Sequence, residues 1–299
     1  MLRLTHEVLF DIAKELIEAG NEEDVYKFAL SGKEPFQATA KAFATLELYN
    51  DRYVIGWDDN CTTFEIKNYK PPCKFLLNQI GNCVLKLSVN TSCHMYSSLT
   101  PYQSVLDKII TKKQLVFFTC DITTIGSFVN EFLPKFSSTL KYVTVQSMTE
   151  TLRDTLILKS LTILDSYHFE FAPNCCKTSS LVLQHCGWDG FERRAPKISD
   201  VSPFLSLIKD LTFNENYCYI MSRKLLIKIT KYFPALESLN VNITLGKYNI
   251  TYESIEKEIK QSTIKLVKAI KQTIKVPEKI TCNYYKFEED MKFPVSLLL

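Results

Sequence analysis

Four thiol and imidazole side chains lie close enough in the sequence to raise the question of a zinc site. They form the pairs Cys175-Cys176 and His185-Cys186, and thiolates with an imidazole are ligands that zinc prefers. Adjacent residues of an extended chain point to opposite faces, so neither pair offers two convergent ligands. Cys186 is also explained by the repeat described below. We therefore expect no metal site.

The other residues that could carry out chemistry have simpler structural explanations. Cys73, Cys83 and Cys93 are evenly spaced, but two of them flank an expected strand, and buried cysteines often serve as small apolar residues. The four histidines show no recognisable nucleophile and base signature. Residues 57–60 begin like a calcium loop but lack its glycine at the sixth position, which favours a strand-terminating turn. We expect no catalytic residue and no cofactor.

One segment combines the residue types that dominate protein–protein binding hot spots. Residues 187–196 read Gly-Trp-Asp-Gly-Phe-Glu-Arg-Arg-Ala-Pro, and aromatic and arginine side chains contribute much of the binding energy at interfaces. The candidate target-binding residues are Trp188, Phe191, Arg193 and Arg194. The alternative is a loop that folds its two aromatic side chains back onto the protein.

Composition narrows the class of protein further. A chain of 299 residues that is 46% hydrophobic can fill a sizeable core, and its net charge of +3 does not indicate nucleic acid or an anionic membrane as the partner. The ten cysteines occur without a signal-peptide pattern at the start of the chain, so we expect reduced thiols in a cytoplasmic or nuclear protein. No apolar run is long enough to predict a membrane span.

The N-terminal residues predict three short helices. The first begins at a Thr5 cap and ends near Gly20, the second follows an Asn21 cap, and the third begins near Pro35. Spacings of three and four residues give the first helix one apolar face. This face is formed by Leu4, Val8, Leu9, Ile12, Ala13 and Leu16.

Residues 2 to 44 resemble an F-box, the helical module of eukaryotic ubiquitin ligase receptors. The resemblance rests on Leu4-Thr5-His6-Glu7-Val8-Leu9, on Ile12 and Leu16, and on Phe28-Ala29-Leu30-Ser31 after an acidic capped turn. It implies docking onto a Skp-type adaptor and, through the adaptor, onto a cullin. The adaptor-binding residues it implies are Leu4, Glu7, Val8, Leu9, Ile12, Leu16, Phe28 and Leu30. The alternative is a small helical cap over the rest of the fold.

A repeat of apolar-x-apolar stretches runs through the remaining chain. The stretches begin at Phe64, Leu85, Leu115, Val143, Leu161, Leu181, Leu211 and Leu239. Their seven intervals sum to 175 residues, a mean of 25. Short polar or thiol side chains, such as Asn90, Cys120 and Asn216, occupy most of the sixth positions and could bond the backbone where each strand turns away.

This pattern resembles the leucine-rich repeats of F-box proteins, most clearly at residues 233–241. The resemblance implies an α/β solenoid of parallel strands, with helical segments between them and a capping helix after Thr251. We therefore expect an F-box-like domain over residues 1–45 and a substrate-binding domain over residues 46–299. The alternative is a mixed α/β domain without true repeats.

These expectations lead to a functional hypothesis without catalysis. The chain is expected to be the substrate-recognition subunit of a Skp-cullin-F-box ubiquitin ligase that positions a protein target for modification. Neither nucleic acid nor a membrane is expected as a partner. The rival hypothesis is a scaffold or sensor that binds a protein or peptide without a ligase.

Overall fold

The computed structural model describes most of the chain. The described residues are 4–57, 60–65, 71–90, 96–121, 126–146, 156–164, 176–184, 203–215, 223–245, 257, 261, 264, 267–268, 277–286 and 292–298. The chain divides into two compact units, Met1–Thr144 and Val145–Leu299. Both units combine helices with strands, and both contain parallel strand pairs. The α/β class expected from the sequence is therefore confirmed, and the expected solenoid stays a prediction.

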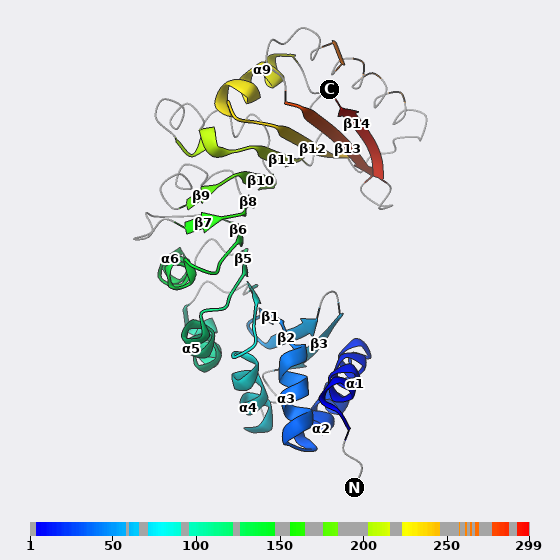
Figure 1. Cartoon of the computed structure of the whole chain (residues 1–299), viewed down its shortest axis with the longest axis vertical. Coiled ribbons are helices and arrows are strands. Elements are labelled where there is room, and N and C mark those ends of the chain that lie inside the picture. The colour runs from blue at the N-terminus through cyan, green and yellow to red at the C-terminus, as the bar shows by residue number, and fades with distance from the viewer. Residues whose placement is uncertain are drawn as a thin grey trace. The chain divides into compact units, whose positions relative to one another are not determined.

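The first unit begins with three helices and continues with alternating strands and helices (Figure 1). Its elements are α1 (His6–Glu18), α2 (Glu22–Leu30), α3 (Lys33–Ala42), β1 (Thr45–Leu48), β2 (Arg52–Trp57), β3 (Asn60–Glu65), α4 (Pro71–Ile80), β4 (Lys86–Val89), η2 (Tyr96–Tyr102), α5 (Gln103–Lys112), β5 (Phe117–Cys120), α6 (Gly126–Phe132), η4 (Leu133–Phe136) and β6 (Tyr142–Val145), whose last residue belongs to the second unit.

The caps expected from the sequence shape the first two helices. The Thr5 hydroxyl accepts a hydrogen bond from the Val8 amide at 3.4 Å, and Asn21 Oδ1 accepts one from the Glu23 amide at 3.0 Å. Between the helices, Gly20 adopts a φ of +71°, which a residue without a Cβ tolerates. The chain can therefore end one helix and start the next within a few residues.

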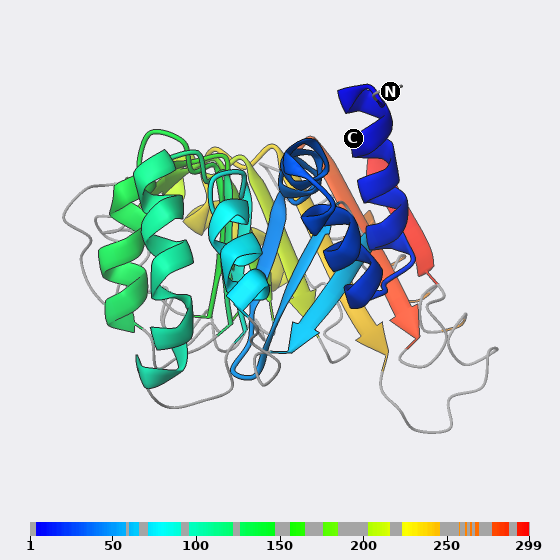
Figure 2. The same cartoon turned by 90° about the horizontal axis from the view of Figure 1, so that it is seen from below.

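Strand order in the first unit is β3-β2-β1-β4-β5-β6. The β1–β2 and β2–β3 pairs are antiparallel, whereas β1–β4 and β4–β5 are parallel. One face buries Leu46, Leu87 and Phe118, which lie in register across β1, β4 and β5. Helices α4 and α5 run side by side (Figure 2) and bury apolar side chains such as Leu77 and Ile109. This burial favours the strand and helix layers over the extended chain.

The second unit also has a parallel core of strands. Its elements are β7 (Leu156–Leu158), β8 (Ser160–Ile163), β9 (Cys176–Thr178), β10 (Ser180–Gln184), η6 (Leu205–Leu207), β11 (Asp210–Glu215), α9 (Arg223–Tyr232), β12 (Ser238–Leu245), β13 (Lys279–Lys286) and β14 (Lys292–Leu298). The order is β8-β10-β11-β12-β13-β14, parallel except for the final antiparallel pair, and β7 pairs separately with β9.

A ladder of asparagine amides crosses three strands of the second unit. Asn242 Nδ2 donates to Asn214 Oδ1 at 2.6 Å, and Asn283 Nδ2 donates to Asn242 Oδ1 at 2.7 Å. The backbone register places these residues opposite one another on β11, β12 and β13. Neighbours along each strand, such as Phe213 and Val241, are buried because alternate side chains point to opposite faces. The ladder therefore joins the polar positions of three strands.

The strand positions expected from the repeat pattern are largely confirmed. Seven of the eight expected starts lie in or within two residues of β4, β5, β6, β8, β10, β11 and β12. Phe64 also lies in a strand, but it is near the end of β3 and pairs with Tyr53 in an antiparallel hairpin, so it does not begin a parallel strand of the repeat. Most of the expected capping helix lies outside the described residues.

The expected division into residues 1–45 and 46–299 stays a prediction. In the structure, α1, α2 and α3 belong to the same compact unit as β1 to β5, and Figure 1 shows them beside β2 and β3. Helices α1 and α2 therefore contact strands of their own unit, and α3 packs against α1, α2 and α4.

Candidate interaction surfaces

Helix α1 has one buried side and one exposed apolar edge. Leu9, Ala13 and Ile17 follow one another at intervals of four residues, and each is at most 5% exposed. At the start of the helix, Leu4 is 55% exposed and Val8 is 42% exposed. The apolar face expected from the sequence is thus divided, with one stripe packed inside the unit and an adjacent edge open to solvent.

Two polar contacts hold α1 on the β2–β3 hairpin. The Thr62 hydroxyl donates a buried hydrogen bond of 3.1 Å to the carbonyl oxygen of Ile17. Lys14 Nζ lies 3.4 Å from the centroid of the Trp57 ring and 4.6 Å from that of Phe10, which is the geometry of a cation–π contact. These contacts fix the rotation of the helix about its axis and so determine which side chains remain exposed.

Aromatic packing supports the same arrangement. The Tyr53 and Phe64 rings stack at 5.1 Å across β2 and β3, and the Tyr26 ring of α2 meets the Phe64 ring edge-on at 5.5 Å. Phe36 of α3 stacks on Phe75 of α4 at 5.2 Å. Aromatic pairs of this geometry contribute about 0.5–1.5 kcal/mol beyond the area they bury.

The expected adaptor-binding residues fall into three classes of exposure. Leu4, Glu7, Val8 and Leu30 are exposed, and Leu30 retains 51% of its surface. Ile12, Leu16 and Phe28 are half-buried. Leu9 is buried in the first unit, so we leave it out of any docking surface. We call Leu4, Val8 and Leu30 the exposed helical edge.

A shallow cleft lies at the first turn of α1. Its volume is about 310 Å³, and it is lined by His6, Glu7, Phe10, Asp11 and Lys41. His6 Nε2 and Lys41 Nζ are 3.0 Å apart. Because an ammonium can only donate, Lys41 is the donor in this contact. Carboxylates and an ammonium line the same cleft, so its charge does not select one class of ligand.

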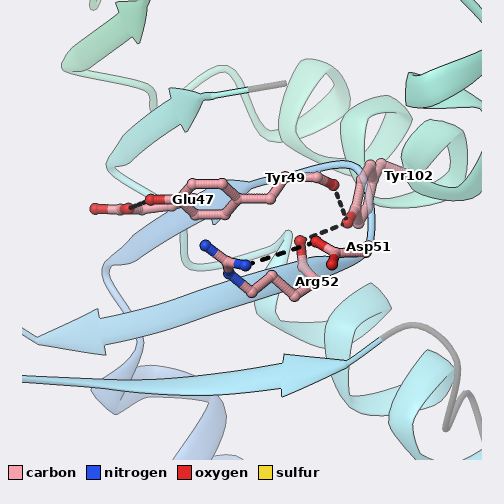
Figure 3. Close-up of polar contacts among 5 residues, drawn as sticks. All are labelled: Glu47, Tyr49, Asp51, Arg52 and Tyr102. Atoms are coloured by element: carbon pink, nitrogen blue, oxygen red, sulfur yellow. Dashed lines mark hydrogen bonds and ion pairs between the residues drawn. The ribbon is translucent and has the colours of Figure 1, made fainter. Parts of the chain in front are cut away.

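A buried tyrosine fixes the turn between β1 and β2 (Figure 3). The Tyr102 hydroxyl lies 2.6 Å from the Tyr49 carbonyl oxygen and 2.7 Å from that of Arg52. The Tyr49 hydroxyl donates to Glu47 Oε2 at 2.9 Å, and the Arg52 guanidinium lies 4.6 Å from the centroid of the Tyr49 ring. Burial raises the Tyr49 pKa, a hydrogen bond with Asn90 lowers it, and Glu47 raises it. The phenol therefore remains protonated around neutral pH.

Two cysteines in the described part of the chain, Cys83 and Cys282, fit a structural role, whereas Cys61 is exposed. Burial raises the pKa of Cys83, and it raises the pKa of Cys282 to about 11, so both thiols are protonated and weakly nucleophilic at neutral pH. Within the described ranges, no group of three His, Cys, Asp or Glu side chains could hold a metal ion. Cys175, His185 and Cys186, the remaining thiol and imidazole candidates, lie outside those ranges.

The expected target-binding residues Trp188, Phe191, Arg193 and Arg194 also lie outside the described residues. Sequence reasoning missed Lys14, Trp57, Thr62 and Tyr102, whose roles depend on contacts between distant segments. No helix among the described residues has both the length and the apolar composition of a membrane span. Comparison with protein-family models, characterised proteins and solved structures finds no match.

Proposed function

We propose that the chain is the substrate-recognition subunit of a Skp-cullin-F-box ubiquitin ligase and docks onto the Skp-type adaptor through the exposed helical edge. The main support is that Leu4, which precedes the Thr5 cap, and Val8 in the first turn of α1 have exposed apolar side chains, while the buried stripe of the helix packs inside the unit. Burying such side chains in a partner is favourable by about 25 cal/mol per Å² of apolar surface.

The regular strand spacing supports the second half of the proposal. Strands near each of seven repeat starts, with buried leucines in register such as Leu161, Leu181 and Leu211, fit a leucine-rich-repeat-like solenoid. Such an array offers a row of strand positions that a protein target can contact. The function would be positioning, with a protein substrate held near the ubiquitin-conjugating machinery.

A co-purification experiment tests adaptor docking. The tagged full chain is expressed in eukaryotic cells together with the Leu4→Asp, Val8→Asp double variant, and adaptor and cullin are measured in the eluates. The wild type should recover both proteins and the variant neither, because a buried unpaired carboxylate costs several kcal/mol. Ile157→Asp is the matched control, because Ile157 is 67% exposed on β7 of the second unit.

Leu9→Asp separates docking from internal packing. Leu9 is buried, so this variant should unfold or aggregate, whereas the double variant should melt like the wild type. A wild-type protein that is folded but recovers no adaptor would favour the rival function, a scaffold or sensor that binds a protein or peptide without a ligase.

A further inference from the structure

Three strand starts of the first unit carry lysines and no acidic residue. Residues 82–90 contain Lys86, residues 111–120 contain Lys112 and Lys113, and residues 135–144 contain Lys135 and Lys141. None of these segments contains Asp or Glu, although the whole chain carries 33 acidic residues against 36 basic ones. These segments carry five of the fifteen Lys and Arg residues of this unit, and their positive charges have no acidic neighbour within the same segment.

The fold brings the three segments together. Lys86 of β4 lies opposite Phe117 of β5 in the parallel register. The amides of Lys141 and Tyr142 both donate to the carbonyl oxygen of Val116, at 2.9 and 3.1 Å. The side chain of Gln114 donates to the carbonyl oxygen of Asn82 at 2.7 Å, which ties the second segment to the first.

Apolar and aromatic side chains are exposed among these lysines. Phe117 is 40% exposed and Leu85 is 42% exposed. The Phe117 ring stacks on the Tyr142 ring with centroids 4.4 Å apart and planes 6° apart, so both rings are held in one orientation before any partner arrives. A fixed aromatic side chain loses little conformational entropy on binding.

The ammonium groups of two lysines also act on Cys83, which belongs to the first of these segments. Burial raises the pKa of the Cys83 thiol, while the ammonium groups of Lys41 and Lys112 oppose that rise from nearby. Lys86 and Lys112 are exposed. The nearest carboxylates along the chain are Asp107 and Glu131, which belong to α5 and α6, and Asp121, which follows the opposite end of β5.

We propose that Leu85, Lys86, Lys112, Phe117, Lys141 and Tyr142, the strand-start patch, bind an acidic segment of a partner protein that also carries an aromatic or aliphatic side chain. Carboxylates would pair with the lysines, and the apolar side chain would cover Phe117 and Leu85. Complementary charge sets the choice of partner and its rate of association, while the central aromatic residue supplies affinity. The inference rests on the proposed function only in taking a protein as the partner.

Fluorescence anisotropy of the full chain with a labelled Glu-Glu-Trp repeat peptide tests the proposal. The wild type should bind, and added salt should weaken the complex because exposed charges are screened. Lys86→Glu and Lys112→Glu should each weaken binding by on the order of tenfold. Lys33→Glu, an exposed lysine at the start of α3 with the same change in net charge, should bind like the wild type.

Further variants test whether peptide binding depends on the strand-start patch itself, and not on the net charge of the protein or on the exposed helical edge. Phe117→Ser should weaken binding without changing the salt dependence, and Leu85→Ser should act similarly if the first variant proves unstable. The Leu4→Asp, Val8→Asp variant should retain peptide binding even where it loses the adaptor. Absence of peptide binding at low salt, equal loss in Lys33→Glu, or tighter binding of a labelled single-stranded RNA would each overturn the proposal.

Discussion

The hydroxyl of Thr62 on β3 donates a hydrogen bond of 3.1 Å to the carbonyl oxygen of Ile17 in the last turn of α1. Both residues are buried. The same carbonyl oxygen accepts from the Gly20 amide at 3.0 Å in the turn that ends the helix. The Thr62 bond is therefore a second one to this oxygen, and it joins α1 to the hairpin.

Thr62→Val should lower the free energy of unfolding by about 1 kcal/mol, because it removes the hydrogen bond between β3 and α1 while the Ile17 carbonyl keeps the Gly20 amide as a donor. Thr63→Val is the matched control, since Thr63 is the next residue on β3 and is exposed; its effect should stay within about 0.5 kcal/mol. Denaturant unfolding followed by tryptophan fluorescence measures both. Equal stability of the two variants would show that the bond does not anchor α1.

Local chemistry made the N-terminal helices predictable, but not their packing. Thr5 and Asn21 indicate helix starts because their side chains can accept hydrogen bonds from the free backbone amides of the first turn. Both capping hydrogen bonds are present in the structure. The burial of Leu9 beside an exposed Val8 depends on Trp57 and Thr62, which belong to β2 and β3. The spacing of apolar residues within α1 therefore does not predict which of them are buried.

The strands were likewise predictable from the sequence only in part, because their pairing depends on distant segments. The alternation of apolar residues predicted strands β4 and β12. Strands β1 and β2 also contain apolar residues, but they pair antiparallel and do not fit the repeat interval. The asparagine ladder falls at unequal spacings along the chain, 28 residues from Asn214 to Asn242 and 41 from Asn242 to Asn283. Its members could be recognised only once the strand register was known.

Asn242→Ala should destabilise the second unit, because Asn242 both donates to Asn214 and accepts from Asn283. The loss should be about 1–3 kcal/mol, since two amide groups lose a partner. Asn240→Ala is the control, two residues earlier on the same strand and face and also half-buried. Hydrogen exchange of the β11, β12 and β13 amides should increase in the first variant only. Equal protection in both would contradict a stabilising ladder.

Lys113→Gly should stabilise the first unit. Lys113 follows α5 with a φ of 52° and donates its amide to the Ile109 carbonyl oxygen. Glycine adopts this left-handed conformation without the steric cost that a Cβ incurs. The expected gain is about 1 kcal/mol, seen as a rise in Tm. Lys112→Gly, inside the last turn of α5, should instead lower Tm; a fall in both variants would contradict this account of the helix end.

Tyr102→Phe should loosen the β1–β2 turn while leaving the ring in place. The variant loses the hydroxyl that contacts the Tyr49 and Arg52 carbonyl oxygens, so the free energy of unfolding should fall by about 1–3 kcal/mol. Tyr142→Phe, on a half-buried ring of the same unit, should change it by less than about 0.5 kcal/mol. Thermal melting measures the stability of both variants. Equal stability of the two would refute the role given to the Tyr102 hydroxyl.

The most direct test of the proposed function is a calorimetric titration of the purified full chain with a purified Skp-type adaptor. The wild type and Ile157→Asp should bind with the same affinity. The Leu4→Asp, Val8→Asp variant should keep the wild-type Tm but show no binding, because carboxylates replace two of the three apolar side chains of the exposed helical edge. A folded wild type that gives no binding heat at micromolar concentrations, or a double variant that binds as tightly as the wild type, would contradict the ligase proposal.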